Sequence, residues 1–270
     1  MTGKTVLVTG ATGGIGLETA RALARRGARV LVGARDVARG QAVADGIVRG
    51  GGRAELLLVD LASFASTREA AARTLAAHPV LDVLVNNAGT ARRHRSLTAD
   101  GHEVTWQTNF LGPFLLTRLL LPALRAAEGV RVVNVASEAH RSGRIDFANL
   151  ELESGWSTYR AYANTKLANV LFTRELARRE PGIAANAVHP GVIATNIWEP
   201  APAWAVAIAR MLMRRPASGA RPVVRLAAAP ELAGVSGRYF KRFRETPPSE
   251  AGRRDADARR LWEIAEKAVG

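Results

Sequence analysis

Short, continuously apolar runs alternate with longer amphipathic segments along most of this chain. An apolar run without polar alternation is typical of a parallel strand that is covered by helices on both faces. Repeated strand–helix units of this length favour right-handed crossovers and a doubly wound parallel sheet, so the pattern predicts an α/β fold. The expected strands are 4–9, 29–34, 54–59, 81–86, 130–136 and 183–189, and the expected helices are 15–26, 36–49, 63–77, 102–127 and 159–179.

No linker or change in composition divides the chain, so we expect residues 1–270 to form one domain. A chain of this length can enclose one sizeable core. Proline and glycine clusters at 190–202 and 214–222 interrupt the regular pattern. We interpret 192–215 as an inserted loop with short helices.

A glycine-rich turn follows the first expected strand and leads into the first helix. It reads Thr9-Gly10-Ala11-Thr12-Gly13-Gly14-Ile15-Gly16. Glycines at positions 10, 14 and 16 allow a sharp turn and a close approach of backbone N–H groups to a pyrophosphate, which the helix N-terminus also attracts. The alternative is an ordinary tight strand–helix connection. The strand and helix context favours dinucleotide binding on a Rossmann fold.

Tyr162 and Lys166 lie four residues apart in the last expected helix and therefore share one face. Hydride transfer to a carbonyl requires a proton for the developing alkoxide, and a phenol with a pKa of about 10 is a poor base near neutrality. An ammonium about 4 Å away contributes roughly 4 kcal/mol at an effective dielectric of about 20, or about three pKa units. We therefore expect Lys166 to lower the pKa of Tyr162. Without its context, this pair is a common solvated helix face.

The TGxxxGIG turn and the YxxxK pair resemble the short-chain dehydrogenase/reductase family, and the similarity extends over nearly the whole chain. It implies an oxidoreductase that binds a nicotinamide cofactor, with Tyr162 rather than Tyr159 as the general acid/base. It also implies that Lys166 contacts the nicotinamide ribose. Further cofactor contacts are implied at Asp60, Leu61, Asn87, Ala88 and Gly89, and in the loop after strand six at Pro190, Gly191, Val192 and Thr195.

The end of the second strand indicates which cofactor is used. Family members that use NAD usually place an acid there for the ribose 2′-hydroxyl, but this chain has Ala34 followed by Arg35. A guanidinium can pair with a 2′-phosphate and lie over the adenine, so we expect NADP(H). The alternative for Arg35 is a solvated residue before the next helix.

Two further residues complete the expected catalytic set. Ser137 ends the fifth strand, where ligands bind in such sheets, and its hydroxyl can donate to a substrate carbonyl. Asn109 matches the family's helix-four asparagine, which anchors a water in the proton path to the lysine. The alternatives are a helix-capping serine and a core asparagine satisfied by backbone groups. We interpret His189 as a structural residue at a strand end.

One branch of the family fits best. Asn134-Val135-Ala136-Ser137 with Ala139-His140, and Tyr162 to Asn169, resemble retinol dehydrogenases and their WW-domain oxidoreductase relatives. Those retinol enzymes are usually membrane-anchored and we see no anchor here, which argues against retinoid itself. Bacterial members of the branch include ketoreductases that act on polycyclic natural products.

Two insertions are expected to shape the substrate pocket. Ser137 and Tyr162 stand further apart than is usual in the family, so 138–158 is an extra segment, with Arg141 and Arg144 at the expected entrance. The 192–215 insertion carries Trp198, Trp204, Met211 and Met213. Indoles and flexible thioethers suit an irregular apolar ligand, although core packing of lid helices is the alternative. We expect a bulky, largely apolar ketone, aldehyde or alcohol as substrate.

Composition excludes several other functions. There is no cysteine, which removes disulfides and thiolate chemistry, and the five histidines lack metal-ligand spacing. The net charge of +14 invites a nucleic-acid interpretation, but 34 of the 38 basic residues are arginine, as a GC-rich genome would produce. We expect a cytoplasmic enzyme that binds neither nucleic acid nor membrane and that forms a homodimer or homotetramer. The alternative is a non-catalytic NADPH-binding regulator or scaffold on the same fold.

Overall fold

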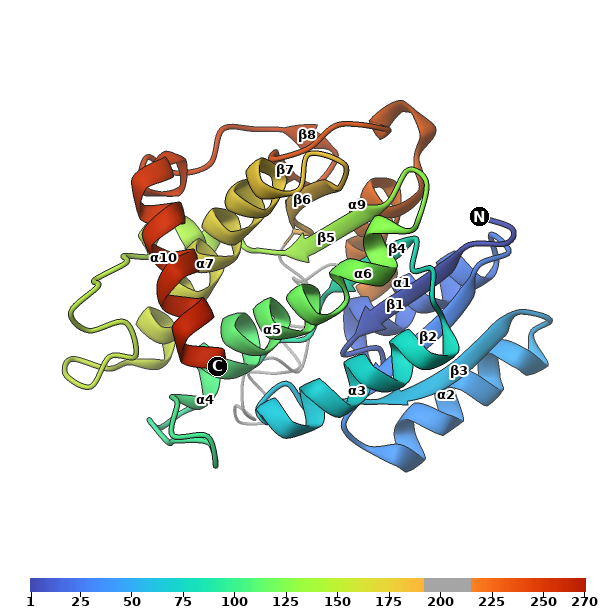
Figure 1. Ribbon diagram of the computed structural model, residues 1–270, viewed down its shortest axis with the longest axis horizontal. Helices are drawn as coiled ribbons and strands as arrows, with labels where there is room; N and C mark the ends of the chain where they lie inside the picture. Colours follow the sequence, from blue (N-terminus) through green and yellow to red (C-terminus); the bar gives the residue numbers. More distant parts are fainter. Residues whose placement is uncertain (192–214) are drawn as a thin grey trace.

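The computed structural model describes residues 1–191 and 215–270, which form one sheet between two helical layers (Figure 1). The strand order is β3-β2-β1-β4-β5-β6-β7-β8. All neighbouring strands are parallel except the last pair, β7 and β8, which form an antiparallel hairpin at the edge. The expected doubly wound α/β fold is confirmed. The strands are β1 (Thr5–Thr9), β2 (Arg29–Ala34), β3 (Arg53–Leu58), β4 (Val83–Asn86), β5 (Arg131–Val135), β6 (Ala184–His189), β7 (Tyr239–Lys241) and β8 (Arg244–Glu245).

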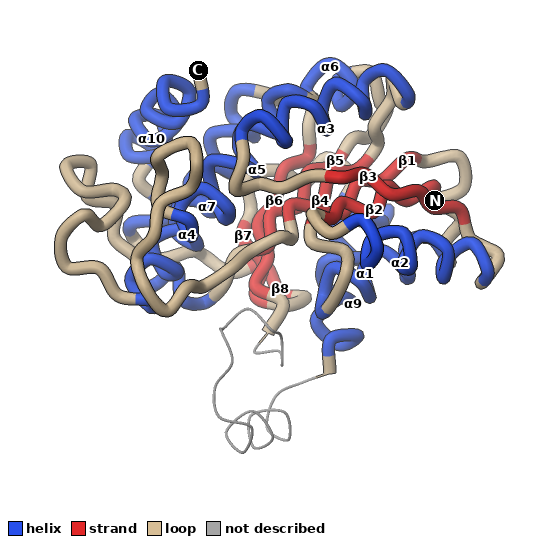
Figure 2. The backbone as a smooth tube through the Cα atoms, turned by 90° about the horizontal axis from the view of Figure 1, so that it is seen from below, coloured by secondary structure: helices blue, strands red, loops and turns tan. Residues whose placement is uncertain are grey.

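The helices cover both faces of the sheet, as Figure 2 shows. One layer holds α1 (Gly14–Ala24), α2 (Val37–Arg49) and α9 (Pro216–Ala228). The other holds α3 (Phe64–Ala77), α5 (Gly112–Leu119), α6 (Leu121–Arg125), α7 (Thr158–Arg179) and α10 (Asp255–Val269). In β1, Leu7 packs into the core on the second side, and its neighbours Val6 and Val8 pack into the core on the first. Both faces are buried, which explains why the strands are continuously apolar.

The expected long helix over 102–127 is divided into shorter pieces. It comprises α4 (Val104–Trp106), a π-helical turn η1 (Gln107–Leu111), α5 and α6. Pro113 lies at the start of α5 and Pro122 at the start of α6, and each removes a backbone N–H donor from the helical run. π-Helical turns often occur at functional sites, and η1 contains Asn109, one of the expected catalytic residues.

The structure adds elements that the sequence pattern did not predict, namely β7, β8, α9 and α10. The α9 helix begins at Pro216 and continues through Pro222, within the cluster that was interpreted as an interruption. The insertion expected at 192–215 lies outside the described residues except for Arg215. Within the described ranges, no helix is both long and apolar enough to span a membrane.

The last helix closes the core on one side. α10 lies beside α7, and its Trp262 packs edge-on against Phe114 of α5, with 4.9 Å between ring centres. The same indole lies 5.8 Å from the Phe172 ring, and the Arg179 guanidinium of α7 lies 4.8 Å above it. The C-terminal helix is therefore part of the main core.

We predict that Trp262→Ala lowers the free energy of unfolding by about 3–5 kcal/mol, the usual cost of removing a buried aromatic side chain. Chemical denaturation followed by circular dichroism measures this change. Phe243→Ala is the control, because this side chain is 38% exposed and its loss should cost less than about 1 kcal/mol. Equal losses in the two variants would contradict the placement of α10 in the core.

Candidate active site

A buried lysine lies at the centre of the candidate site. Lys166 is 2% exposed, and its Nζ donates to the carbonyl oxygen of Val135 at the end of β5 over 2.9 Å. Burial lowers the pKa of Lys166 to about 8, because a charged ammonium is poorly solvated there. This contact fixes α7 against the carboxyl end of β5, which is where ligands bind in open α/β sheets.

Tyr162 lies one turn earlier on the same helix face. The Lys166 Nζ is 5.4 Å from the centre of its ring. Burial raises the pKa of Tyr162 above its ordinary value, and a hydrogen bond with the Ser137 side chain opposes this rise. The sequence-based expectation of a lowered pKa is therefore wrong in direction. The spacing of Tyr162 and Lys166 reveals the attraction between ammonium and phenolate. It does not reveal the cost of burying the phenolate, which is the larger effect.

Ser137 is brought to Tyr162 by the turn that follows β5. Its side chain caps the short 3₁₀ helix η2 (Glu138–Ser142), accepting from the Ala139 N–H over 3.2 Å. The same side chain also hydrogen-bonds with the Tyr162 side chain. The capping and catalytic interpretations of this serine are thus compatible. The structure brings together three of the four expected catalytic residues through direct contacts.

Asn109 is the fourth expected residue and lies in η1. Its side-chain amide accepts from the Thr90 N–H over 2.7 Å and donates to the Thr90 carbonyl over 2.9 Å. It also donates to the Thr165 hydroxyl of α7 over 3.1 Å. A Cβ added at Gly89 would lie 3.5 Å from the Asn109 Oδ1 and 3.6 Å from the Lys166 Nζ. Asn109 therefore borders Lys166, while its side-chain amide joins the Thr90 backbone to Thr165 of α7.

The turn after β4 is attached to the glycine-rich turn after β1. The Asn87 Nδ2 donates to the carbonyl oxygens of Thr9 and Gly10, over 2.8 and 3.3 Å. The Thr9 hydroxyl accepts from the N–H groups of Asn87 and Ala88, over 3.0 and 3.1 Å. Asn87 thus joins the two turns through hydrogen bonds. Sequence reasoning missed this role because it depends on β1 and β4 being neighbours in the sheet.

The glycine-rich turn has the shape of a phosphate cradle. Gly10 and Gly14 have φ values of 65° and 55°, in the left-handed region that favours glycine. A Cβ at Gly16 would lie only 2.3 Å from the Gly10 carbonyl oxygen. No side chain caps the start of α1, so its first N–H groups remain available to an anion. Thr12 and Ile15 belong to the same turn. These residues fit a dinucleotide pyrophosphate.

Two arginines lie near this cradle. Arg35 follows β2 directly and is exposed, as a residue that binds a ligand phosphate must be. Arg39, in the first turn of α2, donates through Nη2 to the Thr12 carbonyl over 3.5 Å. Sequence reasoning missed Arg39, although its place in the first turn of the helix that follows Arg35 was a usable signal.

The remaining expected cofactor residues lie at strand ends along the same sheet edge. Asp60, just after β3, uses Oδ1 to accept from the Ala62 N–H over 2.9 Å, and Leu61 beside it is buried. Pro190 and Gly191 follow β6, where Gly191 has a φ of 105°. Val192 and Thr195 lie outside the described residues. The contacts of these residues with a cofactor stay predictions.

The segment over 138–158 packs onto the protein more than expected. Arg141 donates to the Pro247 carbonyl over 2.9 Å, and the Arg144 N–H donates to the Asn164 side chain over 2.9 Å. The Phe147 ring packs against the core and lies 4.2 Å below the Arg260 guanidinium of α10. Phe147 therefore packs in the core, which is the alternative to lining a substrate pocket. Burial lowers the pKa of His189 to about 4, which keeps this strand-end histidine neutral.

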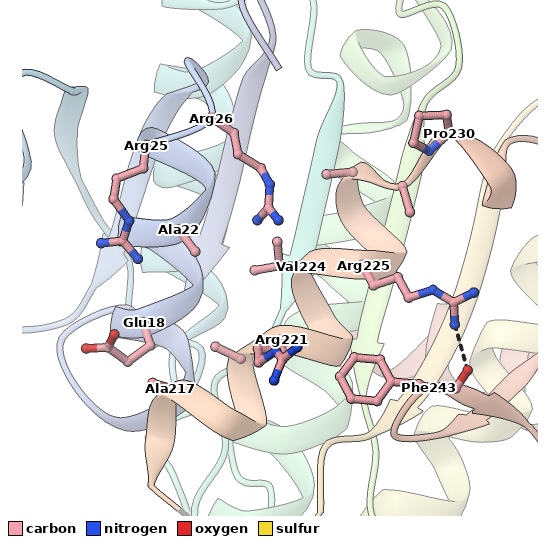
Figure 3. A pocket seen from close by; sticks show the side chains of 13 residues that line it. Glu18, Ala22, Arg25, Arg26, Ala217, Arg221, Val224, Arg225, Pro230 and Phe243 are labelled. Carbon is pink, nitrogen blue, oxygen red and sulfur yellow. Dashed lines mark hydrogen bonds between the residues drawn. The ribbon is translucent and has the colours of Figure 1, made fainter.

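An arginine-lined hollow lies elsewhere, on the outer surface between α1 and α9 (Figure 3). Its volume is about 550 Å³, and none of the four expected catalytic residues lines it. The Arg225 guanidinium donates to the Phe243 carbonyl over 2.6 Å. The arginines that line the hollow are Arg25, Arg26, Arg221 and Arg225. This hollow is separate from the candidate active site. Its four arginines place part of the positive charge of the chain on the protein surface.

The fold and the site together define a dinucleotide-binding α/β oxidoreductase with a serine, a tyrosine and a lysine at the carboxyl edge of the sheet. Residues 4–205 match the family model described as short chain dehydrogenase. The chain belongs to the short-chain dehydrogenase/reductase family, whose fold binds a nicotinamide cofactor, and its relatives are of the retinol dehydrogenase type.

Relatives align over nearly the whole chain. Mouse polyprenol dehydrogenase is 43% identical, over 96% of this chain and 82% of its own. Mouse retinol dehydrogenase 14 is 39% identical, over 100% of this chain and 87% of its own. An uncharacterised protein from Mycobacterium paratuberculosis superposes with a TM-score of 0.81 at 34% identity, covering 99% and 94% of the two chains. A proposed NAD(P)-dependent gluconate 5-dehydrogenase from Beutenbergia cavernae, with NADP bound at low occupancy, gives 0.73 at 29% identity, covering 89% and 95%.

We predict that Lys166 makes folding stability rise between pH 8 and pH 10.5. In this window the unfolded lysine is protonated and the folded one is not, so the unfolded state binds more protons and raising the pH favours the folded state. The gain is on the order of 3 kcal/mol, relative to Lys166→Met at the same pH values. Urea unfolding across this range measures it. Parallel pH curves for the two proteins would show that the ammonium is not buried.

Proposed function

We propose that this protein is an NADP(H)-dependent oxidoreductase that transfers a hydride between the nicotinamide and a bulky, largely apolar carbonyl or alcohol, with Tyr162 as general acid/base. The observation that carries the proposal is the contact between the Tyr162 and Ser137 side chains beside the buried Lys166. A neutral phenol is the form that carbonyl reduction requires, because it donates the proton to the developing alkoxide. Burial keeps Tyr162 in that form.

The cofactor, when bound, supplies or accepts the hydride. The N–H groups at the start of α1 would hold its pyrophosphate, and Arg35 with Arg39 would pair with the 2′-phosphate. Ala34 stands at the end of β2 where family members that use NAD usually have an acid, and the nearby Asp36 carboxylate caps α2 by accepting from the Arg39 N–H over 2.9 Å. Two guanidiniums at this place support NADP over NAD. Asp60 and Leu61 would border the adenine, and the turn at Asn87, Ala88 and Gly89 would border the ribose beside Lys166.

The protein's own residues would handle the substrate carbonyl and the proton. Ser137 would donate a hydrogen bond to the carbonyl oxygen, which stabilises negative charge as it develops. Tyr162 would donate its proton to the same oxygen. The Thr165 hydroxyl accepts from Asn109 and donates to the Tyr162 carbonyl over 2.8 Å, so it keeps this part of α7 in place. A proton could then return through water near Asn109 and Lys166.

The choice of an apolar substrate rests on the relatives and on the sequence. Two relatives that align over almost the entire chain are named for retinol and polyprenol, which are both long, apolar alcohols. The tryptophans and methionines of the 192–215 insertion point to the same class of substrate. Polyprenol-like and polycyclic carbonyl compounds are the first substrates to screen.

We predict that Tyr162→Phe folds and binds NADPH normally and loses about 10²–10⁴-fold in kcat, the usual contribution of a general acid. Tyr159→Phe is the matched control, because this hydroxyl is on the same helix but hydrogen-bonds with Ser142, over 2.9 Å, on the exposed side. NADPH oxidation followed at its absorbance band measures both. Equal rates in Tyr162→Phe and the unaltered protein would refute the assignment. Absence of turnover in the unaltered protein, with NADPH bound, would favour the regulator alternative.

We predict that Arg35→Ala and Arg39→Ala each weaken NADPH binding by about 10- to 100-fold, the usual value of a hydrogen bond to a charged group. NADH binding should change little, because NADH lacks the 2′-phosphate. Fluorescence titration with both cofactors gives the ratio. Arg49→Ala, at the other end of α2, is the control. A similar affinity of the unaltered protein for NADH and NADPH would overturn the NADP assignment.

A further inference from the structure

A fully buried histidine lies directly behind the candidate catalytic serine. His140 belongs to η2, the short helix that Ser137 caps, and its side chain is excluded from solvent. Its ring packs against the ring of Tyr239 in β7, with 4.6 Å between the centres. A buried imidazole needs a partner for each ring nitrogen, and His140 has both.

The two partners define the proton position on this ring. The Nδ1 atom lies 2.7 Å from the Ser137 carbonyl oxygen, which can only accept, so Nδ1 carries the proton. The Nε2 atom lies 3.0 Å from the Ser249 backbone N, whose N–H can only donate, so Nε2 must be unprotonated. The hydrogen bonds are therefore compatible with the neutral Nδ1–H tautomer alone.

We propose that His140 is a positioning residue for hydride transfer, which holds the Ser137 peptide so that the serine hydroxyl faces Tyr162. The proposal rests on the function proposed for Ser137 and Tyr162. The Ser137 carbonyl accepts two hydrogen bonds from His140, one from the side chain and one from the backbone N–H over 3.1 Å. Without these two bonds the Ser137 backbone would be free to shift and carry the serine side chain away from the tyrosine, and misplacement by about 1 Å can cost about 100-fold in rate.

The end of η2 is pressed onto α7, which leaves the serine turn little freedom to shift as a unit. A Cβ at Gly143 would lie 2.5 Å from the carbonyl oxygen of Ala163, the residue after Tyr162. With this end fixed, the orientation of the Ser137 peptide is set mainly by His140.

The second ring nitrogen joins the serine turn to the C-terminal part of the chain. Ser249 belongs to the segment between β8 and η4 (Ala251–Arg253), and its side chain accepts from the Gly252 N–H over 3.1 Å. Arg141, next to His140, donates to the Pro247 carbonyl of the same segment. His140 thus holds the catalytic turn on one side and the C-terminal segment on the other.

Several charged or titratable groups face this histidine. Burial lowers the pKa of His140, with a smaller lowering from the Arg141 guanidinium, while the Ser137 carbonyl and Glu138 act in the opposite direction. From β7, the Tyr239 hydroxyl and the Lys241 ammonium both donate to Glu138, over 2.8 Å each. His189 of β6 is near as well, and burial keeps it neutral. A proton added to the Nε2 of His140 would face the Ser249 N–H and break that contact.

Two variants separate the roles of the two nitrogens. In His140→Asn the amide nitrogen can replace Nδ1 as donor to the Ser137 carbonyl, but nothing replaces Nε2. In His140→Gln the longer side chain places its polar end near Ser249 and leaves the Ser137 carbonyl without its side-chain donor. Both remove a buried ring, so both should lower the unfolding temperature. We expect kcat of His140→Gln to fall at least tenfold below that of His140→Asn, with KM for NADPH unchanged in both.

The pH profile supplies a second readout. As pH falls below 6.5, the ordinary pKa of histidine, the unfolded protein gains a proton that folded His140 resists, so folding stability falls. The unaltered protein should lose stability in this range more steeply than His140→Asn. Its kcat should fall more steeply at the lower pH where folded His140 itself gains the proton. His189 is buried in both proteins, and the Coulombic effect of His140 on its pKa, which burial exceeds, is absent from His140→Asn.

The outcomes distinguish the proposal from its basis. Equal kcat values for the two His140 variants, together with the same acid limb for the unaltered protein and His140→Asn and an inactive Tyr162→Phe, would overturn the positioning role and leave the proposed function intact. An active Tyr162→Phe would refute the proposed function instead, and the difference in acid stability between the unaltered protein and His140→Asn would still test the tautomer. Loss of folding in one variant alone would also contradict the proposal, which expects similar destabilisation in both.

Discussion

The site depends on a single constraint, which is that a buried ammonium must have a hydrogen-bond partner. Lys166 meets it with the carbonyl of Val135, the last residue of β5. This contact sets the register of α7 across the carboxyl end of the strand. With that register fixed, Tyr162 comes to lie one turn away on the same face, and Ser137 follows two residues after Val135. The geometry of the candidate catalytic residues is therefore a consequence of where one charge can be buried.

The elements with a strong periodic signal could be predicted, and those stabilised by tertiary contacts could not. The first six strands match the apolar runs to within about two residues at each end, as is usual for such boundaries. The β7 strand has only three residues and β8 has only two, so both are too short to have a pattern of their own. Two prolines obscured α9. The α10 helix did carry a signal, with Asp255 and Asp257 in its first turn and Leu261, Ala265 and Val269 at helical spacing.

The candidate site shows the same division. Motif spacing located the serine, the tyrosine and the lysine, because their residue types are fixed by the chemistry. Motif spacing did not reveal the hydrogen bonds between Asn87 and Thr9, since they join turns more than seventy residues apart in sequence. Nor did it give the correct direction for the pKa of Tyr162. A pairwise charge argument can be made from spacing, whereas desolvation depends on everything packed around the group.

The positive charge also changes meaning once residues are placed. Many arginines sit in surface ion pairs, such as those of Arg73 with Glu69 and Arg254 with Glu250, which individually contribute little to stability. Others surround the hollow between α1 and α9. Among the described residues, Arg39 reaches the glycine-rich turn through the Thr12 carbonyl, and Arg35 lies four positions earlier, directly after β2. The overall charge is therefore not an indicator of function in this protein, whereas the position of two guanidiniums is.

The C-terminal part of the chain belongs to the site although the family model ends at residue 205. Tyr239 and Lys241 hold Glu138, the residue after Ser137, and although burial alone would raise the pKa of Glu138, their hydrogen bonds lower it to about 2. Ser249 holds His140 on the other side of the same turn. The serine turn is thus supported from behind by residues that come after β6 in the chain. A fold that ended after β6 would keep the cofactor cradle and leave the Ser137 turn without this support.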